Sequence, residues 1–160
     1  MEIQYRQIGL IRSPFQDPAG MPIQPNSAQG VQGTVVVEEA LARGLRDLDG
    51  FSHIILLYHF HLSRGVELLV KPFLDDQERG LFATRAPRRP NSIGLSIVEL
   101  LEVRGNILRI ANVDVLDRTP LLDIKPYVSY FDQPEATRLG WLAGAAEKSK
   151  TKQSDDRFSA

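Results

Sequence analysis

Apolar residues along this chain form short runs that are separated by turn-forming residues. Strands are expected where β-branched and aromatic residues gather between Gly, Pro, Asn and Asp. The expected strands span residues 2–11, 33–37, 51–61, 68–73, 93–103 and 107–116. Many short strands, few helices and frequent turns predict an all-β or β-rich barrel.

Three stretches carry more specific signals. The run 51–61 is almost continuously apolar, which predicts a strand covered on both faces. Gly105-Asn106 is a good two-residue turn, so the segments 93–103 and 107–116 should pair antiparallel. The segment from Asp17 to Gly33 is dense in Pro and Gly and should form a long loop.

Helical signals are fewer. Residues 38–48 show a brief helix-like pattern that Gly44 weakens. Residues 134–148 are expected to form a C-terminal helix, capped by Asp132. From Ser149 onward the chain is polar, so we expect one domain over residues 1–148 and a disordered tail over 149–160.

Composition narrows the class of protein. A chain of 160 residues with 42% apolar and 24% charged residues is typical of one globular domain. No run of eighteen apolar residues is present and the N-terminus lacks a secretion signal, so neither a membrane span nor export is expected. The absence of cysteine excludes disulfides and thiolate chemistry and fits a cytoplasmic location. A net charge of −1 argues against a generally basic nucleic-acid binder.

The charge is unevenly distributed, however. Residues 79–92 carry four arginines and no acid. Arginine presents a planar fork of donors that suits carboxylate and phosphate, and a local positive field can steer a polyanion. This loop is therefore the first candidate for binding, against the alternative of a solvated charged loop.

Residues 80–96, GLFATRAPRRPNSIGLS, resemble the signature of the TsaA-like (TrmO) family. Further similar motifs lie at residues 8–15, 51–61 and 112–127, in the family's order, so that the resemblance covers about residues 3–145. Ser92 stands where the family usually has proline. The resemblance implies an S-adenosylmethionine-dependent methyltransferase that acts on N6-threonylcarbamoyladenosine beside the tRNA anticodon.

The resemblance also implies a small antiparallel β-barrel with a few short helices and a C-terminal helix. The chain lacks G-x-G-x-x-G after its first strand, which agrees with a fold that is not doubly wound. Family members dimerise, with the cofactor site near the subunit contact. Longer members carry a further C-terminal domain that helps to hold tRNA, so the resemblance favours the cofactor more strongly than the tRNA.

Site residues follow from the same resemblance. The implied cofactor contacts are Pro22, Ile23, Gln24, His61, Leu62, Arg85, Leu95, Asp114, Val115, Leu116 and Asp117. Arg85 is the candidate partner for an acidic group, while Asp114 and Asp117 suit ribose hydroxyls or the positive sulfonium. For each aspartate the alternative is a turn residue bonded to its own backbone.

The candidate substrate contacts are Arg88, Arg89, Asn91 and Lys125. Arginine grips phosphate and asparagine reads an amide or base edge. For Lys125 the alternative is an ion pair within the chain near Asp123.

Histidine suggests no metal site. His53, His59 and His61 share one parity along the strand, but the chain has no cysteine and no obvious third ligand nearby. The base that accepts the N6 proton is left unassigned, with His61 and Tyr127 as alternatives. Two rival functions stay open: a methyltransferase of the same family with a smaller acceptor, and a non-catalytic module that binds cofactor or RNA.

Overall fold

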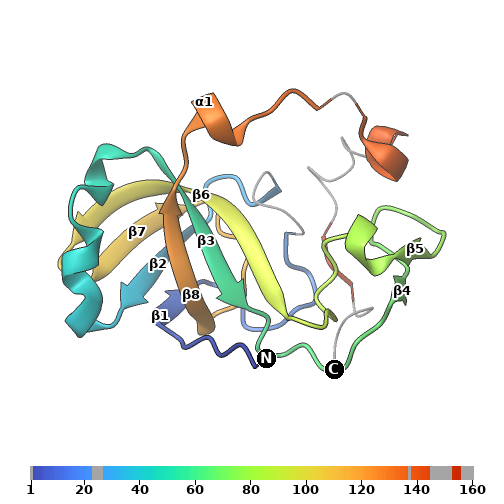
Figure 1. Ribbon diagram of the computed structural model, residues 1–160, viewed down its shortest axis with the longest axis horizontal. Coiled ribbons are helices and arrows are strands. Elements are labelled where there is room, and N and C mark those ends of the chain that lie inside the picture. The colour runs from blue at the N-terminus through green and yellow to red at the C-terminus, as the bar shows by residue number, and fades with distance from the viewer. Residues whose placement is uncertain (1, 23–26, 137, 145–152, 156–160) are drawn as a thin grey trace.

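The computed structural model describes residues 2–22, 27–136, 138–144 and 153–155. An antiparallel, closed β-barrel dominates it, in the strand order β1-β2-β7-β6-β3-β8 (Figure 1). The barrel strands are β1 Gly9–Arg12, β2 Gln32–Val37, β3 His53–His59, β6 Ile93–Arg104, β7 Ile107–Ala111 and β8 Thr119–Pro126. The predicted small β-barrel is therefore confirmed.

Two features of the barrel follow directly from local sequence. The predicted hairpin is confirmed, because β6 and β7 pair antiparallel with Arg104 opposite Ile107. Gly105 occupies the turn with a φ of 61°, a left-handed conformation that glycine adopts without steric cost. The short strand β1 then closes the barrel by pairing with both β2 and β8.

The core fills the interior of the barrel from alternate positions of each strand. In β3 the buried side chains are Ile54, Leu56 and Tyr58, whereas the residues between them face outward and are only partly covered. Within the single chain, residues 51–61 are therefore not covered on both faces, contrary to the prediction. A barrel strand has one inner and one outer face, and here the outer face also carries apolar residues.

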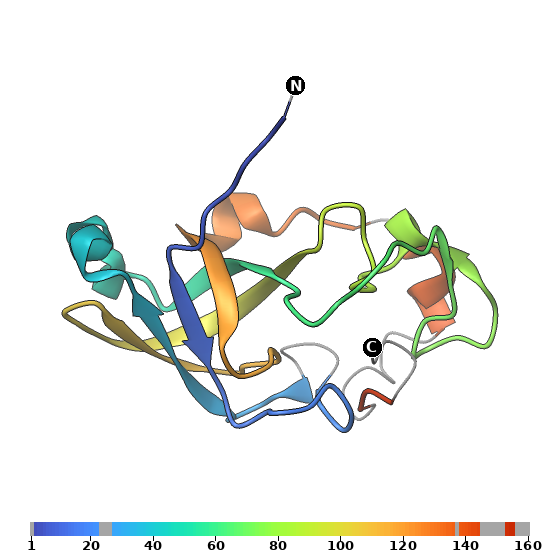
Figure 2. The same cartoon turned by 90° about the horizontal axis from the view of Figure 1, so that it is seen from below.

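A small lobe lies beside one end of the barrel (Figure 2). It contains the two-stranded sheet of β4 Leu69–Val70 and β5 Arg79–Gly80, followed by the 3₁₀ helix η4 Leu81–Ala83. Its buried residues are Val70, Leu81 and Ala86, a cluster separate from the barrel core. The lobe thus has little core of its own.

Several predicted boundaries need correction. Strand β1 begins at Gly9 rather than at residue 2, and β7 ends at Ala111 rather than at 116. Residues 38–48 contain a 3₁₀ helix, η2 Glu39–Leu45, and η3 follows at Leu48–Gly50. No described helix is long and apolar enough to cross a membrane.

The predicted C-terminal helix over 134–148 is wrong for the residues that the structure describes. The chain instead forms a single helical turn, α1 Ser129–Asp132, and the 3₁₀ helix η5 Gly140–Gly144. Asp132 ends α1 rather than capping a later helix, and its carboxylate accepts a hydrogen bond from the Val128 N–H at 2.7 Å. This bond satisfies a backbone donor at the start of α1. Within the predicted helix, Gly140 has a φ of 58°, a left-handed conformation that interrupts a right-handed helix.

The expected tail from residue 149 is described only at residues 153–155. There Gln153 forms a β-bridge with Pro22, and the Ser154 hydroxyl accepts a hydrogen bond from the Met21 N–H at 2.9 Å. These residues lie against the loop that follows β1. The domain boundary at 148 stays a prediction.

Gly94 occupies the closest contact between β3 and β6. It lies opposite Tyr58 in the register, and both residues face the interior. A Cβ atom at Gly94 would lie 2.2 Å from Cε2 of Tyr58 and 2.9 Å from Cζ of Phe60. The absence of a side chain at position 94 therefore leaves the space in which both rings lie.

We expect Gly94→Ala to lower the free energy of unfolding by about 1–3 kcal/mol, the usual cost of overpacking a filled core. Gly44→Ala is the matched control, because a Cβ there meets nothing within 4 Å. Denaturant unfolding of both variants measures the difference. Equal midpoints for Gly94→Ala and wild type would show that the two rings can move without cost.

Candidate functional site

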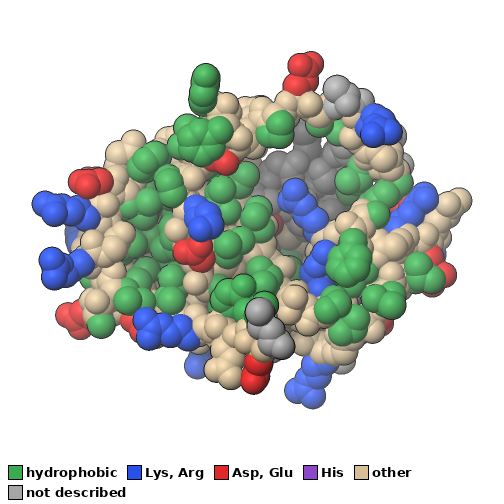
Figure 3. Space-filling view, in the orientation of Figure 1, with side chains coloured by type: hydrophobic (Ala, Val, Ile, Leu, Met, Phe, Trp, Pro, Cys, Tyr) green, Lys and Arg blue, Asp and Glu red, His purple; other side chains and the backbone are tan. Residues whose placement is uncertain are grey.

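A cavity of about 900 Å³ lies between the end of the barrel and the lobe. This volume is in the range of roughly 300–1,000 Å³ that is typical of small-molecule sites. Its walls come from part of each of the segments 17–22, 58–64, 84–95, 114–116 and 154–155, together with Phe73. Figure 3 shows the molecule hollowed between barrel and lobe, with Lys and Arg side chains at the rim.

A chain of hydrogen bonds from Tyr58 through Ser96 to Asp114 lies at the barrel end of this cavity. Ser96 donates its only hydroxyl proton to Oδ1 of Asp114 at 2.6 Å. The Tyr58 hydroxyl lies 3.0 Å from the same Ser96 oxygen, so Tyr58 is the donor of that bond. The chain thereby joins β3, β6 and the loop before β8.

Asp114 titrates abnormally in this setting. Burial raises the pKa of its carboxyl to about 6, although the Ser96 hydrogen bond and the Arg85 charge both act in the opposite direction. Burial, with the Asp114 charge as a second cause, also raises the pKa of the Tyr58 hydroxyl, which therefore stays protonated and able to donate. The cavity thus contains one carboxyl whose charge changes near neutral pH.

Arginines bring positive charge to the opposite wall. Arg85 and Arg89 both line the cavity from the loop between η4 and β6. The Arg85 charge is close enough to lower the pKa of Asp114. Arg89 donates to the carbonyl oxygens of Leu81, Thr84 and Ala86, at 3.4, 3.1 and 3.3 Å. These contacts hold the arginine loop in one shape.

His61 follows the end of β3 and also lines the cavity. Burial lowers the pKa of its imidazole, and the nearby His59 and Arg118 lower it further. The ring is therefore mainly neutral at pH 7, and one of its nitrogens can accept a hydrogen bond.

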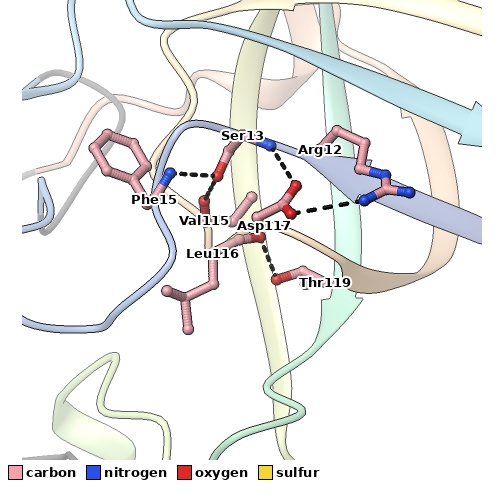
Figure 4. A network of polar contacts seen from close by, with 7 residues as sticks. All are labelled: Arg12, Ser13, Phe15, Val115, Leu116, Asp117 and Thr119. Atoms are coloured by element: carbon pink, nitrogen blue, oxygen red, sulfur yellow. Dashed lines mark hydrogen bonds and ion pairs between the residues drawn. The ribbon is translucent and has the colours of Figure 1, made fainter.

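The loop that carries Asp114 is fastened to the end of β1 (Figure 4). Ser13 donates its hydroxyl to the Val115 carbonyl at 2.6 Å, and its N–H to Oδ1 of Asp117 at 3.2 Å. The other oxygen of Asp117 lies 3.6 Å from an Arg12 nitrogen. Asp117 is outside the cavity lining and ties two segments together, which favours the structural alternative for this residue.

The structure brings most of the predicted cofactor contacts together. Those that line the cavity are Pro22, His61, Leu62, Arg85, Leu95, Asp114, Val115 and Leu116. Ile23 and Gln24 lie outside the described residues. Within the described part of the chain, Asp117 is the predicted cofactor contact that lies away from the cavity.

The predicted substrate contacts are more scattered. Arg89 lines the cavity, whereas Arg88, Asn91 and Lys125 do not. Arg88 forms an ion pair with Glu67, and Lys125 pairs with Asp123 at 2.8 Å, the alternative foreseen for it. Tyr127, one alternative for the base, packs edge-on against His53 and does not line the cavity.

Sequence reasoning missed several residues of the site. Tyr58 and Phe60 line it, and Ser96 connects Tyr58 to Asp114. Gly94 and Ser96 lie within the signature segment, which is a signal that could have drawn attention to them. Ser63 also lines the cavity, and its buried hydroxyl has no hydrogen-bond partner among the described residues.

No group of three or more metal-ligating side chains occurs within residues 2–22, 27–136, 138–144 and 153–155. The cavity is lined by three carboxyl groups, three guanidinium groups and one imidazole among apolar side chains, from Asp17, Asp114, Asp155, Arg64, Arg85, Arg89 and His61. Such a site suits an organic ligand that carries charges of both signs.

Known proteins resemble this chain in sequence. A family profile described as tRNA-methyltransferase O N-terminal domain matches residues 10–133. A protein of Pyrococcus abyssi, named a probable S-adenosyl-L-methionine-binding protein, is 53% identical over 98% of this chain and 85% of its own length. The tRNA (adenine(37)-N6)-methyltransferase of Escherichia coli is 37% identical over 84% of this chain and 62% of its own length.

Solved structures resemble it in fold. A crystal structure of TrmO from Pseudomonas aeruginosa matches with a TM-score of 0.74 and 36% identity, over 88% of this chain and 63% of that one. The chain thus spans less than two thirds of that protein and of the Escherichia coli enzyme.

The titration of Asp114 gives a testable dependence of stability on pH. Because the folded pKa of about 6 lies above the ordinary value of 3.8, the contribution of Asp114 to the stability of the wild type is fully present below pH 3.8 and is lost as pH rises through 6. Asp114→Asn removes this decline. Its stability relative to wild type should therefore increase between pH 4 and pH 8 by on the order of 2–3 kcal/mol.

Thermal or denaturant unfolding of both proteins across that range measures the effect. Taking the difference between them cancels the titration of His61 and other groups that they share. A difference that stays constant with pH would contradict the raised pKa of Asp114.

Proposed function

Because the chain belongs to the family of the tRNA-methyltransferase O N-terminal domain, we propose that it methylates N6 of N6-threonylcarbamoyladenosine beside the tRNA anticodon, with S-adenosylmethionine as donor. The observation that carries the proposal is the cavity, which collects eight of the residues that the sequence resemblance implies for the cofactor. A cytoplasmic location, where tRNA is modified, belongs to the same proposal.

The residues of the cavity fit this cofactor by charge. The amino-acid carboxylate of the cofactor requires a cation, which Arg85 supplies. Its sulfonium is stabilised by a carboxylate, which Asp114 supplies when ionised. When bound, the cofactor provides an electrophilic methyl group.

Apolar and neutral groups of the cavity suit the rest of the molecule. Leu62, Leu95 and Leu116 offer apolar surface for a purine. The unpartnered hydroxyl of Ser63 offers a hydrogen bond that the described residues leave unmade. This orphaned polar atom is an independent sign that a polar ligand completes the site.

The chain contributes to the reaction mainly by positioning. Orientation of donor and acceptor within one enclosed site accounts for much of the rate of a displacement reaction. Tyr58 and Ser96 hold the Asp114 carboxyl in place. The neutral imidazole of His61 offers the cavity a nitrogen that can accept a hydrogen bond. His61 is our candidate for the group that receives the N6 proton.

A homodimer belongs to the same proposal. The outward positions of β6 are apolar, with Ile93, Leu95 and Ile97 exposed by 37%, 46% and 36%. Figure 3 shows green side chains gathered over β3 and β6 on this face. Leu95 also lines the cavity, so a partner that covers this face would lie next to the cofactor. A symmetric pair would bury the same apolar surface twice.

The test of the proposed function is methyl transfer to undermodified tRNA. The full chain is incubated with labelled S-adenosylmethionine and tRNA that carries unmethylated N6-threonylcarbamoyladenosine, and the nucleosides are analysed by mass spectrometry. We expect the label in the methylated form of that nucleoside. Label in another acceptor, or cofactor binding without transfer to any RNA, would refute the assignment in favour of one of the rival functions.

Arg85→Ala provides the binding control for this experiment. Loss of a charge-assisted hydrogen bond costs roughly 1.5–3 kcal/mol, which corresponds to about a ten- to hundred-fold weaker binding of S-adenosylhomocysteine. Arg104→Ala, at an exposed hairpin end away from the cavity, should bind as wild type does. Calorimetric titration with S-adenosylhomocysteine compares wild type, Arg85→Ala and Arg104→Ala. Unchanged affinity of a folded Arg85→Ala would refute the role of Arg85 in cofactor binding.

The dimer is tested with Ile97→Lys, which introduces a charge at an outward position of β6 that does not line the cavity. We expect the wild type to sediment as a dimer and this variant as a folded monomer. Ile107→Lys is the matched control, because Ile107 is 41% exposed on β7. A wild type with monomer mass at every concentration, with and without S-adenosylhomocysteine, would refute the dimer.

A further inference from the structure

Phe82 is an exposed aromatic residue on a tightly fixed backbone. Its ring is 75% exposed, whereas the preceding Leu81 is 1% exposed and anchors the lobe core. Leaving a phenylalanine in water forgoes roughly 1.5–3 kcal/mol of burial. The Phe82 side chain nevertheless stays exposed, because hydrogen bonds fix the backbone on both sides of it.

The carbonyl oxygens of the two residues that flank Phe82 both accept hydrogen bonds. The Leu81 carbonyl accepts hydrogen bonds from the N–H and the hydroxyl of Thr84, at 3.0 and 2.8 Å. The Ala83 carbonyl accepts a hydrogen bond from the Trp141 indole at 2.8 Å. Thus η4 is fastened on both sides of the ring, and the ring is presented in a defined position.

Two aromatic rings near η4, those of Phe82 and Trp141, each have an arginine lying over them. The Arg89 guanidinium is 5.6 Å from the centre of the Phe82 ring, and the Arg79 guanidinium is 5.9 Å from that of Trp141. The described partners of Arg89 are backbone carbonyls rather than carboxylates, so its charge is not neutralised by them. Aromatic rings combined with guanidinium groups are typical of surfaces that bind single-stranded nucleic acid.

The position of this pair relates it to the cavity. Arg89, Arg85 and Thr84 line the cavity, while Phe82 lies on the same turn but outside the lining. Because the guanidinium of Arg89 is 5.6 Å from the centre of the Phe82 ring, the ring lies next to a residue of the cavity wall. Enzymes that modify a nucleobase take the base out of its stack, which leaves the neighbouring base without a stacking partner.

We propose that Phe82, together with Arg89, is a stacking platform for the unpaired nucleobase that flanks the acceptor adenosine of the RNA. This inference rests on the proposed function. The flanking base lies on the Phe82 ring and replaces the stacking that it loses when the acceptor enters the cavity, while Arg89 attracts the adjoining phosphate.

A second copy of the chain is the competing occupant of this surface. Residues 62–92 carry six Lys and Arg against four Asp and Glu. A symmetric contact through this lobe would bring two such surplus positive charges together, which is unfavourable, whereas a polyanion neutralises them. The apolar outer face of β6 offers a copy of the chain a contact with fewer charges.

The experiment uses the full chain and an RNA stem–loop in which a fluorescent purine analogue replaces the base beside the acceptor. Stacking on an aromatic ring quenches this analogue. We expect Phe82→Ala and Phe82→Leu to lose the quenching and to bind the RNA about five- to a hundred-fold more weakly, because stacking on an aromatic side chain contributes about 1–3 kcal/mol per base. Phe82→Trp should retain both.

Controls separate stacking from general damage. Tyr130→Ala removes an aromatic ring that is 96% exposed in α1 and does not line the cavity, and it should bind RNA as wild type does. S-adenosylhomocysteine affinity should be unchanged in all Phe82 variants. Because the Phe82 ring contributes little to the core, these variants are expected to fold.

The outcomes for the two proposals differ. Wild-type RNA binding by Phe82→Leu, absence of quenching in wild type, or no RNA binding at all would overturn the platform. A change in self-association of Phe82→Ala without a change in RNA binding would overturn it in favour of a second copy. Quenching by wild type without methyl transfer would instead refute the proposed function and leave the platform standing.

Discussion

The hydrogen-bonded chain from Tyr58 through Ser96 to Asp114 is the interaction on which the site depends. A carboxyl that is largely removed from water is costly to ionise unless a donor compensates it. Here Ser96 of β6 donates to Asp114, and Tyr58 of the neighbouring strand β3 donates to Ser96. The strand order places β3 beside β6, and Gly94 leaves the space that the Tyr58 ring occupies. Barrel topology and site chemistry are therefore specified by the same few residues.

The barrel and the lobe contribute different properties to the cavity. The barrel end supplies a rigid wall with the buried acid, and the segment after β1 fixes the loop that carries it. The lobe supplies arginines, and its small core of Val70, Leu81 and Ala86 is supplemented by the contact of Trp141 with Ala83. The Asp114 carboxyl thus lies on the barrel side of the cavity, and Arg85 and Arg89 lie on the side of the lobe.

Local sequence was sufficient for some of these features and insufficient for others. Gly105-Asn106 specified a hairpin because a two-residue turn determines its own pairing. The signature resemblance identified residues of one cavity, although it also included Asp117, whose side chain instead bonds Ser13 and Arg12. The relay through Ser96 could not be predicted, because it depends on the register of β3 and β6, which places Ser96 two residues beyond Gly94, the residue opposite Tyr58. The apolar spacing after Pro134 indicated a helix, but Gly140 adopts a left-handed conformation that interrupts a right-handed helix.

Closure of the barrel has a consequence for how the chain acquires its ligand site. Gly9 of β1 pairs with Leu121 of β8, and the cavity gathers segments from residue 17 to residue 155. Contacts between residues so distant in the sequence are slow to form, since a long loop must be ordered before they are made. During synthesis the ligand site cannot exist until β8 has left the ribosome. An incomplete chain therefore cannot be stabilised by a ligand. The cofactor stabilises only the chain in which β8 has paired.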